Sequence, residues 1–165
     1  MIDIRSATTA DVAALVECHL TCWHEAYAEL APADYLAELE NSQPARISYW
    51  TTKIANGEAP WLAVDDEAVI GIAHAGPTED DDLRPGLTLF AIYLRAAYWG
   101  TGLGDRLHRT IGDQPTSLWV LPENARAVRF YRRHGFEPDG AEQLHPGLRR
   151  TIIRLVRPPS KTPDR

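Results

Sequence analysis

The feature that most constrains the fold of this chain is a change of hydrophobic period near residue 100. Residues 87–94 form a largely apolar run typical of a buried strand, and apolar residues at positions 103, 107 and 111 then follow helical spacing. Gly100, Gly102 and Gly104 lie between the two patterns. Glycines allow a tight turn that gathers backbone N–H groups, and a helix start adds unpaired donors. The pattern suits a phosphate or pyrophosphate ligand, although glycines that only permit a tight strand-to-helix turn would look the same.

Two common phosphate-binding motifs do not fit this segment. A dinucleotide fingerprint needs G-x-G-x-x-G, but its last position is Asp105 when counted from Gly100 and Leu107 when counted from Gly102. The Gly-Lys-Ser/Thr of a P-loop does not occur in the sequence. The identity of the phosphate-containing ligand therefore depends on other residues of the chain.

The rest of the chain alternates strand and helix patterns, which predicts one α/β (α+β) domain. Strands are expected at residues 2–5, 61–64, 68–75, 87–94, 117–121 and 150–156. Helices are expected after residue 9, after Pro32, around residues 47–54, over residues 100–111 and over residues 124–133, the last ended by Gly135 in a left-handed conformation. Residues 1–157 are expected to form the domain, and the proline-containing residues 158–165 a flexible tail.

Composition excludes several classes of protein. The formal net charge of −6 argues against nucleic acid as the main partner, because phosphate backbones need a basic face. No apolar stretch is long enough to span a membrane, and the first residues lack the order of a signal peptide, so we expect a cytoplasmic protein. Cys18 and Cys22 could share a helix face with His19 or His24, but zinc needs about four ligands, and buried reduced thiols are the simpler interpretation. We expect no metal.

Two motifs in order resemble the GNAT N-acetyltransferases. The segment Trp99-Gly100-Thr101-Gly102-Leu103-Gly104 is similar to that family's acetyl-CoA pyrophosphate loop, Arg/Gln-x-x-Gly-x-Gly/Ala, with Trp99 in place of Arg or Gln. About twenty residues later, a strand over 118–121 leads to Asn124 and a helix with Phe130-Tyr131, closed by Gly135-Phe136, as in the family's second signature. The resemblance implies a GNAT-like domain: a mixed, mostly antiparallel sheet of about six to seven strands flanked by helices, with the acyl-CoA site at its splayed central strands.

The resemblance also implies roles for individual residues. The strand end at Ile92, Tyr93 and Leu94 would pair with pantetheine, and Asn124 would contact the same arm. The loop from Trp99 through Gly104 would wrap the pyrophosphate of acetyl-CoA, and a tryptophan at its first position would pack on the cofactor or on the domain. The cofactor-binding set is therefore Ile92, Tyr93, Leu94, Trp99, Gly100, Thr101, Gly102, Leu103, Gly104 and Asn124.

The catalytic chemistry needs a proton donor and a proton acceptor. Tyr131 matches the phenol that acts as general acid to the CoA thiolate in similar proteins, although its spacing from Ala127 also describes an ordinary core stripe. The sequence does not single out one general base. The candidates are Glu25, His24, His145, the acidic run 79–82 and water. Trp23, Tyr27 and Glu79 are the candidates for acceptor binding, against a core or solvated role.

The predicted activity is transfer of the acetyl group of acetyl-CoA to a primary amine, on a small molecule, a protein N-terminus or a lysine. A non-catalytic acyl-CoA-binding regulatory module and a nucleotide-binding enzyme are the alternatives. The expected partners are acetyl-CoA and an amine acceptor, with a monomer or homodimer as the oligomeric state.

Overall fold

The computed structural model describes residues 1–159, and within them the predicted α/β class is confirmed. The strands are β1 (Asp3–Ser6), β2 (Trp61–Asp65), β3 (Ala68–Pro77), β4 (Leu87–Leu94), β5 (Thr116–Val120), β6 (Glu137–His145) and β7 (Arg150–Arg157). The helices are α1 (Val12–Tyr27), α2 (Ala33–Asn41), α3 (Gln43–Ala55), α4 (Leu103–His108) and α5 (Ala125–Arg133). Short 3-10 helices are η1 (Thr9–Asp11), η2 (Asp81–Leu83), η3 (Ala96–Tyr98) and η4 (Arg109–Ile111). The predicted tail covers residues 158–165, and its residues 160–165 lie outside the described part of the chain.

The strands follow the order β1-β2-β3-β4-β5-β7-β6. The pairs β1–β2, β2–β3, β5–β7 and β6–β7 are antiparallel, whereas β4 and β5 are parallel, joined through Leu87 with Thr116 and Thr88 with Ser117. A parallel pair needs a crossover connection, and α4 with η4 lies in that connection. The expected mixed, mostly antiparallel sheet is therefore confirmed.

Contacts divide the chain into two compact units, which we describe separately. Unit 1 consists of residues 1–74 and 91–110, and unit 2 consists of residues 75–90 and the chain from Ile111 onward. Strand β4 contributes its first half to unit 2 and its second half, from Ala91 to Leu94, to unit 1.

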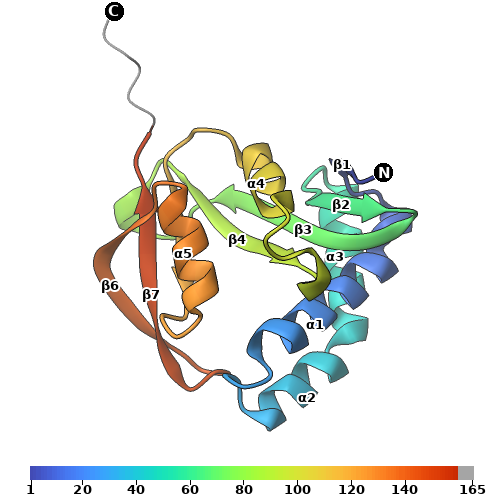
Figure 1. Cartoon of the computed structure of the whole chain (residues 1–165), viewed down its shortest axis with the longest axis horizontal. Helices are drawn as coiled ribbons and strands as arrows, with labels where there is room; N and C mark the ends of the chain where they lie inside the picture. Colours follow the sequence, from blue (N-terminus) through green and yellow to red (C-terminus); the bar gives the residue numbers. More distant parts are fainter. Residues whose placement is uncertain (160–165) are drawn as a thin grey trace, which may run out of the picture. The chain divides into compact units, whose positions relative to one another are not determined.

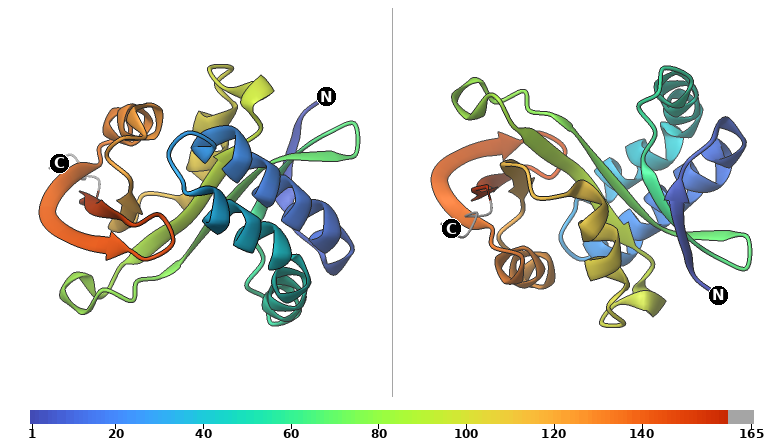
Figure 2. Two further views of the ribbon diagram at one scale, coloured as in Figure 1. Left: turned by 90° about the horizontal axis from the view of Figure 1, so that it is seen from below. Right: turned by 90° about the horizontal axis from the view of Figure 1, so that it is seen from above.

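In unit 1 the two faces of β2 and β3 carry different helices. Leu62 belongs to a core with α1, α2 and α3, whereas the adjacent Ala63 packs with Leu103 and Leu107 of α4. Figure 2 shows the same arrangement, with α1–α3 in front of the strands in one view and α4 in front in the other. Successive residues of a strand point to opposite faces, and this alternation places the three N-terminal helices opposite α4.

A β-bulge in β3 shapes the end of β4. Ala63 pairs with Gly71 and Val64 pairs with Val69, which leaves Ile70 as the extra residue on β3. The Ile70 carbonyl accepts a hydrogen bond of 3.0 Å from the Arg95 amide, just past β4. A Cβ added to Gly71 would come within 2.5 Å of Leu94 Cδ2 and 3.1 Å of the Tyr93 carbonyl oxygen, so a side chain at this position would require its neighbours to shift.

In unit 2 the helix α5 ends as the sequence predicts. Gly135 has φ +84°, and the Phe136 amide donates to the Tyr131 carbonyl at 3.1 Å. Phe136 is fully buried and closes the end of α5, which is the orange helix of Figure 1. Strand β6, which pairs with β7, is not among the strands expected from the sequence. Its side chains are mostly exposed and polar, so its sequence lacks the alternating apolar pattern from which a strand is predicted.

Candidate active site

The turn between β4 and α4 is an exposed loop of glycines in unit 1. Gly100 has φ +74° and Gly102 has φ +84°, and Gly102 directly precedes the first residue of α4. A Cβ at either glycine would meet nothing within 4 Å, so the left-handed backbone and not a neighbouring atom demands glycine here. Leu103 and Leu107 are buried and anchor α4 in the core. The loop backbone is therefore held by a fixed helix while its own surface stays open.

Trp99 packs on the protein itself. Its indole N–H donates a hydrogen bond of 2.9 Å to the carbonyl oxygen of Leu94, the last residue of β4. In the same loop, the Thr101 hydroxyl donates a hydrogen bond of 2.7 Å to the Tyr98 carbonyl oxygen. The Trp99 side chain fastens the glycine loop to the end of β4.

Glu25 of α1 positions the same strand end. Its carboxylate accepts from the Arg95 guanidinium at 3.1 Å and from the Ala96 backbone amide at 2.7 Å. Both oxygens are thus hydrogen-bonded, so Glu25, one of the candidate bases, serves to fix the backbone after β4. The sequence analysis missed this role because 70 residues separate Glu25 from Arg95, and nothing in either segment signals the pairing.

Five rings gather where α1 and α2 meet the end of β4, and we call them the aromatic cluster. His19 stacks on Tyr93 with ring centroids 4.9 Å apart, and Trp23 stacks on Tyr27 at 4.4 Å. Trp23 also meets Tyr35 edge-on at 6.0 Å and Tyr93 at 6.3 Å. The tertiary fold thus brings together Tyr93, Trp23 and Tyr27, which the sequence singled out for different roles.

Burial controls the ionisation of the cluster. It lowers the pKa of His19 to about 4, with a further contribution from the Arg46 charge, so this imidazole is neutral at pH 7. Burial also raises the pKa of Tyr93 far above its usual range, while a hydrogen bond from Trp23 and the charge of Arg46 act in the opposite direction. The cluster therefore offers neutral rings and no proton acceptor that is charged at pH 7.

Asn124 and Tyr131 lie on the same helix of unit 2. Asn124 is buried and caps α5, and its side-chain oxygen accepts from the Ala127 amide at 3.3 Å. Tyr131 lies in the last full turn and is partly buried, with its ring edge-on to Phe130 at 5.5 Å and to Phe136 at 5.8 Å. The helix thus presents an amide at one end and a phenol near the other.

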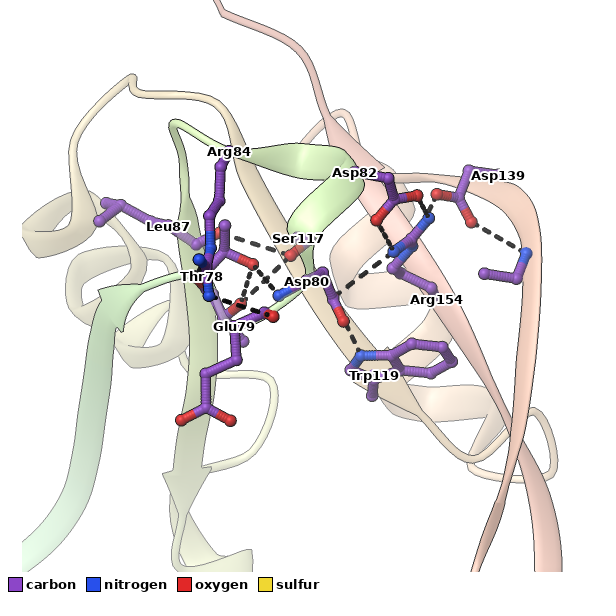
Figure 3. A network of polar contacts seen from close by, with 12 residues as sticks. Thr78, Glu79, Asp80, Asp82, Arg84, Leu87, Ser117, Trp119, Asp139 and Arg154 are labelled. Carbon is purple, nitrogen blue, oxygen red and sulfur yellow. Dashed lines mark hydrogen bonds and ion pairs between the residues drawn. The ribbon is translucent and has the colours of Figure 1, made fainter.

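The acidic run at residues 79–82 is largely engaged in a structural network of unit 2 (Figure 3). Arg154 of β7 forms two hydrogen bonds with Asp82, at 2.9 and 2.6 Å, and one with Asp139 at 2.7 Å. Asp80 lies 3.6 Å from the same guanidinium and accepts from the Trp119 indole at 3.3 Å. The side chain of Arg154 is 9% exposed, so the network locks the loop before β4 onto β7.

Glu79 differs from the other acids of the run. Asp81 pairs with Arg84 at 3.2 Å, whereas the Glu79 side chain is exposed and points away from the network in Figure 3. Among the acids of the run, Glu79 is therefore the one whose carboxylate stays available to a charged ligand.

Replacing Arg154 with leucine is expected to lower the free energy of unfolding by about 2 kcal/mol at pH 7, because three carboxylates would lose their common cation. Thermal denaturation followed by circular dichroism measures this change. The matched control is Arg84→Leu, which removes an exposed guanidinium and is expected to change stability by less than about 0.5 kcal/mol. Equal melting temperatures for the parent and Arg154→Leu would contradict the structural role of the network.

The same network predicts a pH dependence. The hydrogen bond from Arg154 lowers the pKa of Asp82 below its usual value of 3.8. A carboxylate with a lowered pKa stabilises the fold above the unfolded pKa, and this contribution is lost as the pH falls through the lowered value. The melting temperature should therefore fall less between about pH 5 and pH 2 in Arg154→Leu than in the parent.

The remaining candidate bases and thiols have structural surroundings. His24 Nε2 lies 2.9 Å from Glu40 Oε1, and His145 Nδ1 accepts from the Leu148 amide at 3.1 Å. Cys18 and Cys22 are buried with their Sγ atoms 3.9 Å apart. Within residues 1–159 no three His, Cys, Asp or Glu side chains are placed to hold a metal ion, and no helix is long and apolar enough to cross a bilayer.

Comparison with known proteins defines the class. The family profile described as "Acetyltransferase (GNAT) domain" matches residues 56–138, half of the chain, including the glycine loop and α5. The chain therefore belongs to the GNAT acetyltransferase family, as its two motifs predicted. It is 26% identical over 145 residues to the uncharacterized N-acetyltransferase YuaI of Bacillus subtilis strain 168, a match that covers 83% of this chain and 81% of YuaI.

Solved structures share the fold. The PaiA N-acetyltransferase from Thermoplasma acidophilum, in complex with coenzyme A, superposes with a TM-score of 0.75 at 17% identity, covering 96% of this chain and 99% of PaiA. YncA from Salmonella typhimurium, with its cofactor acetyl-CoA, superposes with a TM-score of 0.68 at 21% identity, covering 100% of this chain and 98% of YncA. The predicted GNAT-like fold is thus confirmed.

Proposed function

We propose that this protein is an acetyl-CoA-dependent N-acetyltransferase that acts on a primary amine. The observation that carries the proposal is the exposed loop of left-handed glycines after β4, in a chain of the GNAT acetyltransferase family. YuaI is an N-acetyltransferase by name, and PaiA and YncA hold coenzyme A or acetyl-CoA in their structures. These relatives support acetyl-CoA as the co-substrate.

The loop from Trp99 to Gly104 is proposed to bind the pyrophosphate of acetyl-CoA. Gly100 and Gly102 have positive φ, a conformation that allows a loop to turn its backbone N–H groups toward one point, and such backbone donors can bind phosphate without a basic side chain. This explains how a chain with a net charge of −6 and no Arg or Gln at position 99 can hold an anionic cofactor. The strand end at 92–94 and Asn124 are proposed to contact the pantetheine arm.

The reaction consists of a direct transfer. The amine nitrogen attacks the thioester carbonyl carbon, the C–S bond breaks, and the CoA thiolate leaves with the electron pair of that bond. We assign protonation of the leaving thiolate to the Tyr131 hydroxyl. The amine proton leaves to water or to a side chain other than Glu25 and His145, because the acceptor atoms of these two residues are occupied by hydrogen bonds. Trp23, Tyr27 and Glu79 remain the proposed acceptor-binding residues.

Release of free CoA thiol during incubation with acetyl-CoA and a panel of primary amines tests the function. We expect release that depends on both acetyl-CoA and an amine, with an N-acetylated product identified by mass spectrometry. Coenzyme A binding in calorimetry without turnover of any amine would instead identify a regulatory acyl-CoA-binding module. Stabilisation by ATP or NAD that exceeds stabilisation by CoA at equal concentration would contradict both.

A further inference from the structure

Arg46 is a cation without an acidic partner beside the aromatic cluster. It lies in α3, and its neighbour Ile47 packs against the same core as Trp23, Tyr35 and Tyr93. Within residues 1–159 no carboxylate forms an ion pair with Arg46, whose guanidinium donates a hydrogen bond to the Ser42 hydroxyl. Arg95 and Arg154, by contrast, have carboxylate partners. Its charge is therefore available to an anion.

The guanidinium of Arg46 is held in a fixed position. Its Nε–H donates to Ser42 Oγ at 2.8 Å, and the Ser42 hydroxyl in turn donates to the Leu39 carbonyl at 2.6 Å. This chain connects the end of α2 to the start of α3 and leaves the terminal nitrogens of the guanidinium, Nη1 and Nη2, for another acceptor. Two parallel N–H groups of this kind match the two oxygens of a carboxylate.

The location of Arg46 argues for a ligand and against a role in helix stability. Arg46 lies in the first turn of α3, a turn without acidic residues, where the helix dipole disfavours a cation. The Arg46 charge acts on His19, Tyr35 and Tyr93, and Glu38 is the acidic group that also acts on Tyr35, from an exposed position. The Arg46 charge thus acts on three of the five rings of the aromatic cluster.

We propose that the acceptor carries a carboxylate besides the amine that is acetylated, and that Arg46 binds this carboxylate next to the aromatic cluster. The substrate class is that of free amino acids and related amino carboxylates with an apolar or aromatic side chain, which the rings contact. The inference rests on the proposed N-acetyltransferase function and names the acceptor of that same site. It disfavours polyamines and other acceptors that carry only positive charge.

Matched pairs of acceptors test the inference. Leucine and phenylalanine are compared with their carboxamides and with isoamylamine and phenethylamine, which lack the carboxylate. We expect kcat/KM for the carboxylates to exceed that of their carboxamides by about 10-fold or more in the parent, a difference in the range of hydrogen bonds to charged groups. Arg46→Gln should abolish the difference, and Arg46→Lys should restore part of it.

Arg109→Gln is the control, because it removes the charge of an exposed arginine in unit 1. It should keep the parent's preference. Equal turnover of carboxylates and carboxamides by the parent, or an unchanged preference in Arg46→Gln, would overturn the inference while the proposed function stands.

A binding measurement separates the two proposals. Tryptophan fluorescence with leucine or phenylalanine in the presence of CoA should give a Kd that rises about 10-fold or more in Arg46→Gln. If no amine is acetylated, the proposed function fails, and this Kd change decides the inference alone. An equal Kd for the parent and Arg46→Gln would overturn it.

Discussion

Tyr131→Phe is expected to lower kcat about 100-fold or more while the Kd for CoA stays within about twofold of the parent's value. The substitution removes one hydroxyl and keeps the ring, whose edge-on contacts with Phe130 and Phe136 hold α5 in place. Without a proton donor, the thiolate must leave as an anion, which raises the barrier to C–S cleavage. Steady-state thiol release and calorimetry with CoA measure the two effects.

Tyr49→Phe is the matched control for this prediction. Tyr49 lies on α3 with half of its surface exposed, so its variant loses an equivalent hydroxyl at a position that we assign no role in the reaction. Its kcat should equal that of the parent. If Tyr131→Phe retained the parent's kcat at every pH, Tyr131 would have no part in proton transfer, and water would have to supply the proton to the leaving thiolate.

Gly102→Val is expected to raise the Kd for CoA by about 10- to 100-fold. Gly102 has φ +84° and directly precedes α4, and a β-branched residue is a genuine outlier in that conformation. Valine would force the loop into another backbone conformation and turn its N–H groups away from the pyrophosphate. Isothermal titration calorimetry with CoA gives the Kd directly, independent of the acceptor.

Gly57→Val supplies the matched control for the loop. Gly57 also has φ +84° with nothing within 4 Å of an added Cβ, but it follows α3 and not β4. Both variants should lose stability by about 1–2 kcal/mol, since the backbone strain is the same. Only Gly102→Val should lose CoA affinity. A similar Kd in both variants would show that the glycine loop does not bind the pyrophosphate.

The order of strands and helices could be predicted because each element carries its own local signal. The apolar run at 87–94, the helical spacing after Gly102 and the helix stop at Gly135 are patterns within a few residues of the chain, and the structure confirms each. Strand β6 shows the limit of this approach. It is held by backbone hydrogen bonds to β7 and exposes most of its side chains, so its residues carry no period to be recognised.

Long-range pairings had no such signal. The acidic run at 79–82 predicts a solvated or substrate-attracting loop, but Arg154, 72 residues away from Asp82, engages it in a structural network. Glu25 is a further example. The sequence leaves it open as a candidate base, because its partners Arg95 and Ala96 are far along the chain and their hydrogen bonds to Glu25 cannot be predicted from spacing. A carboxylate's role depends on which cation the fold brings to it, and sequence spacing does not contain that information.

By itself, the sequence determined the family, the glycine loop and the order of the elements, because these depend on local backbone preferences and on two motifs of adjacent residues. Only the tertiary structure decided the surroundings of the site. It fastened Trp99 to the end of β4, gathered five rings from α1, α2 and β4, and left Arg46 beside them with no acidic partner among residues 1–159. Such contacts between distant segments are set by how helices pack on a sheet and not by the residues adjacent in the chain.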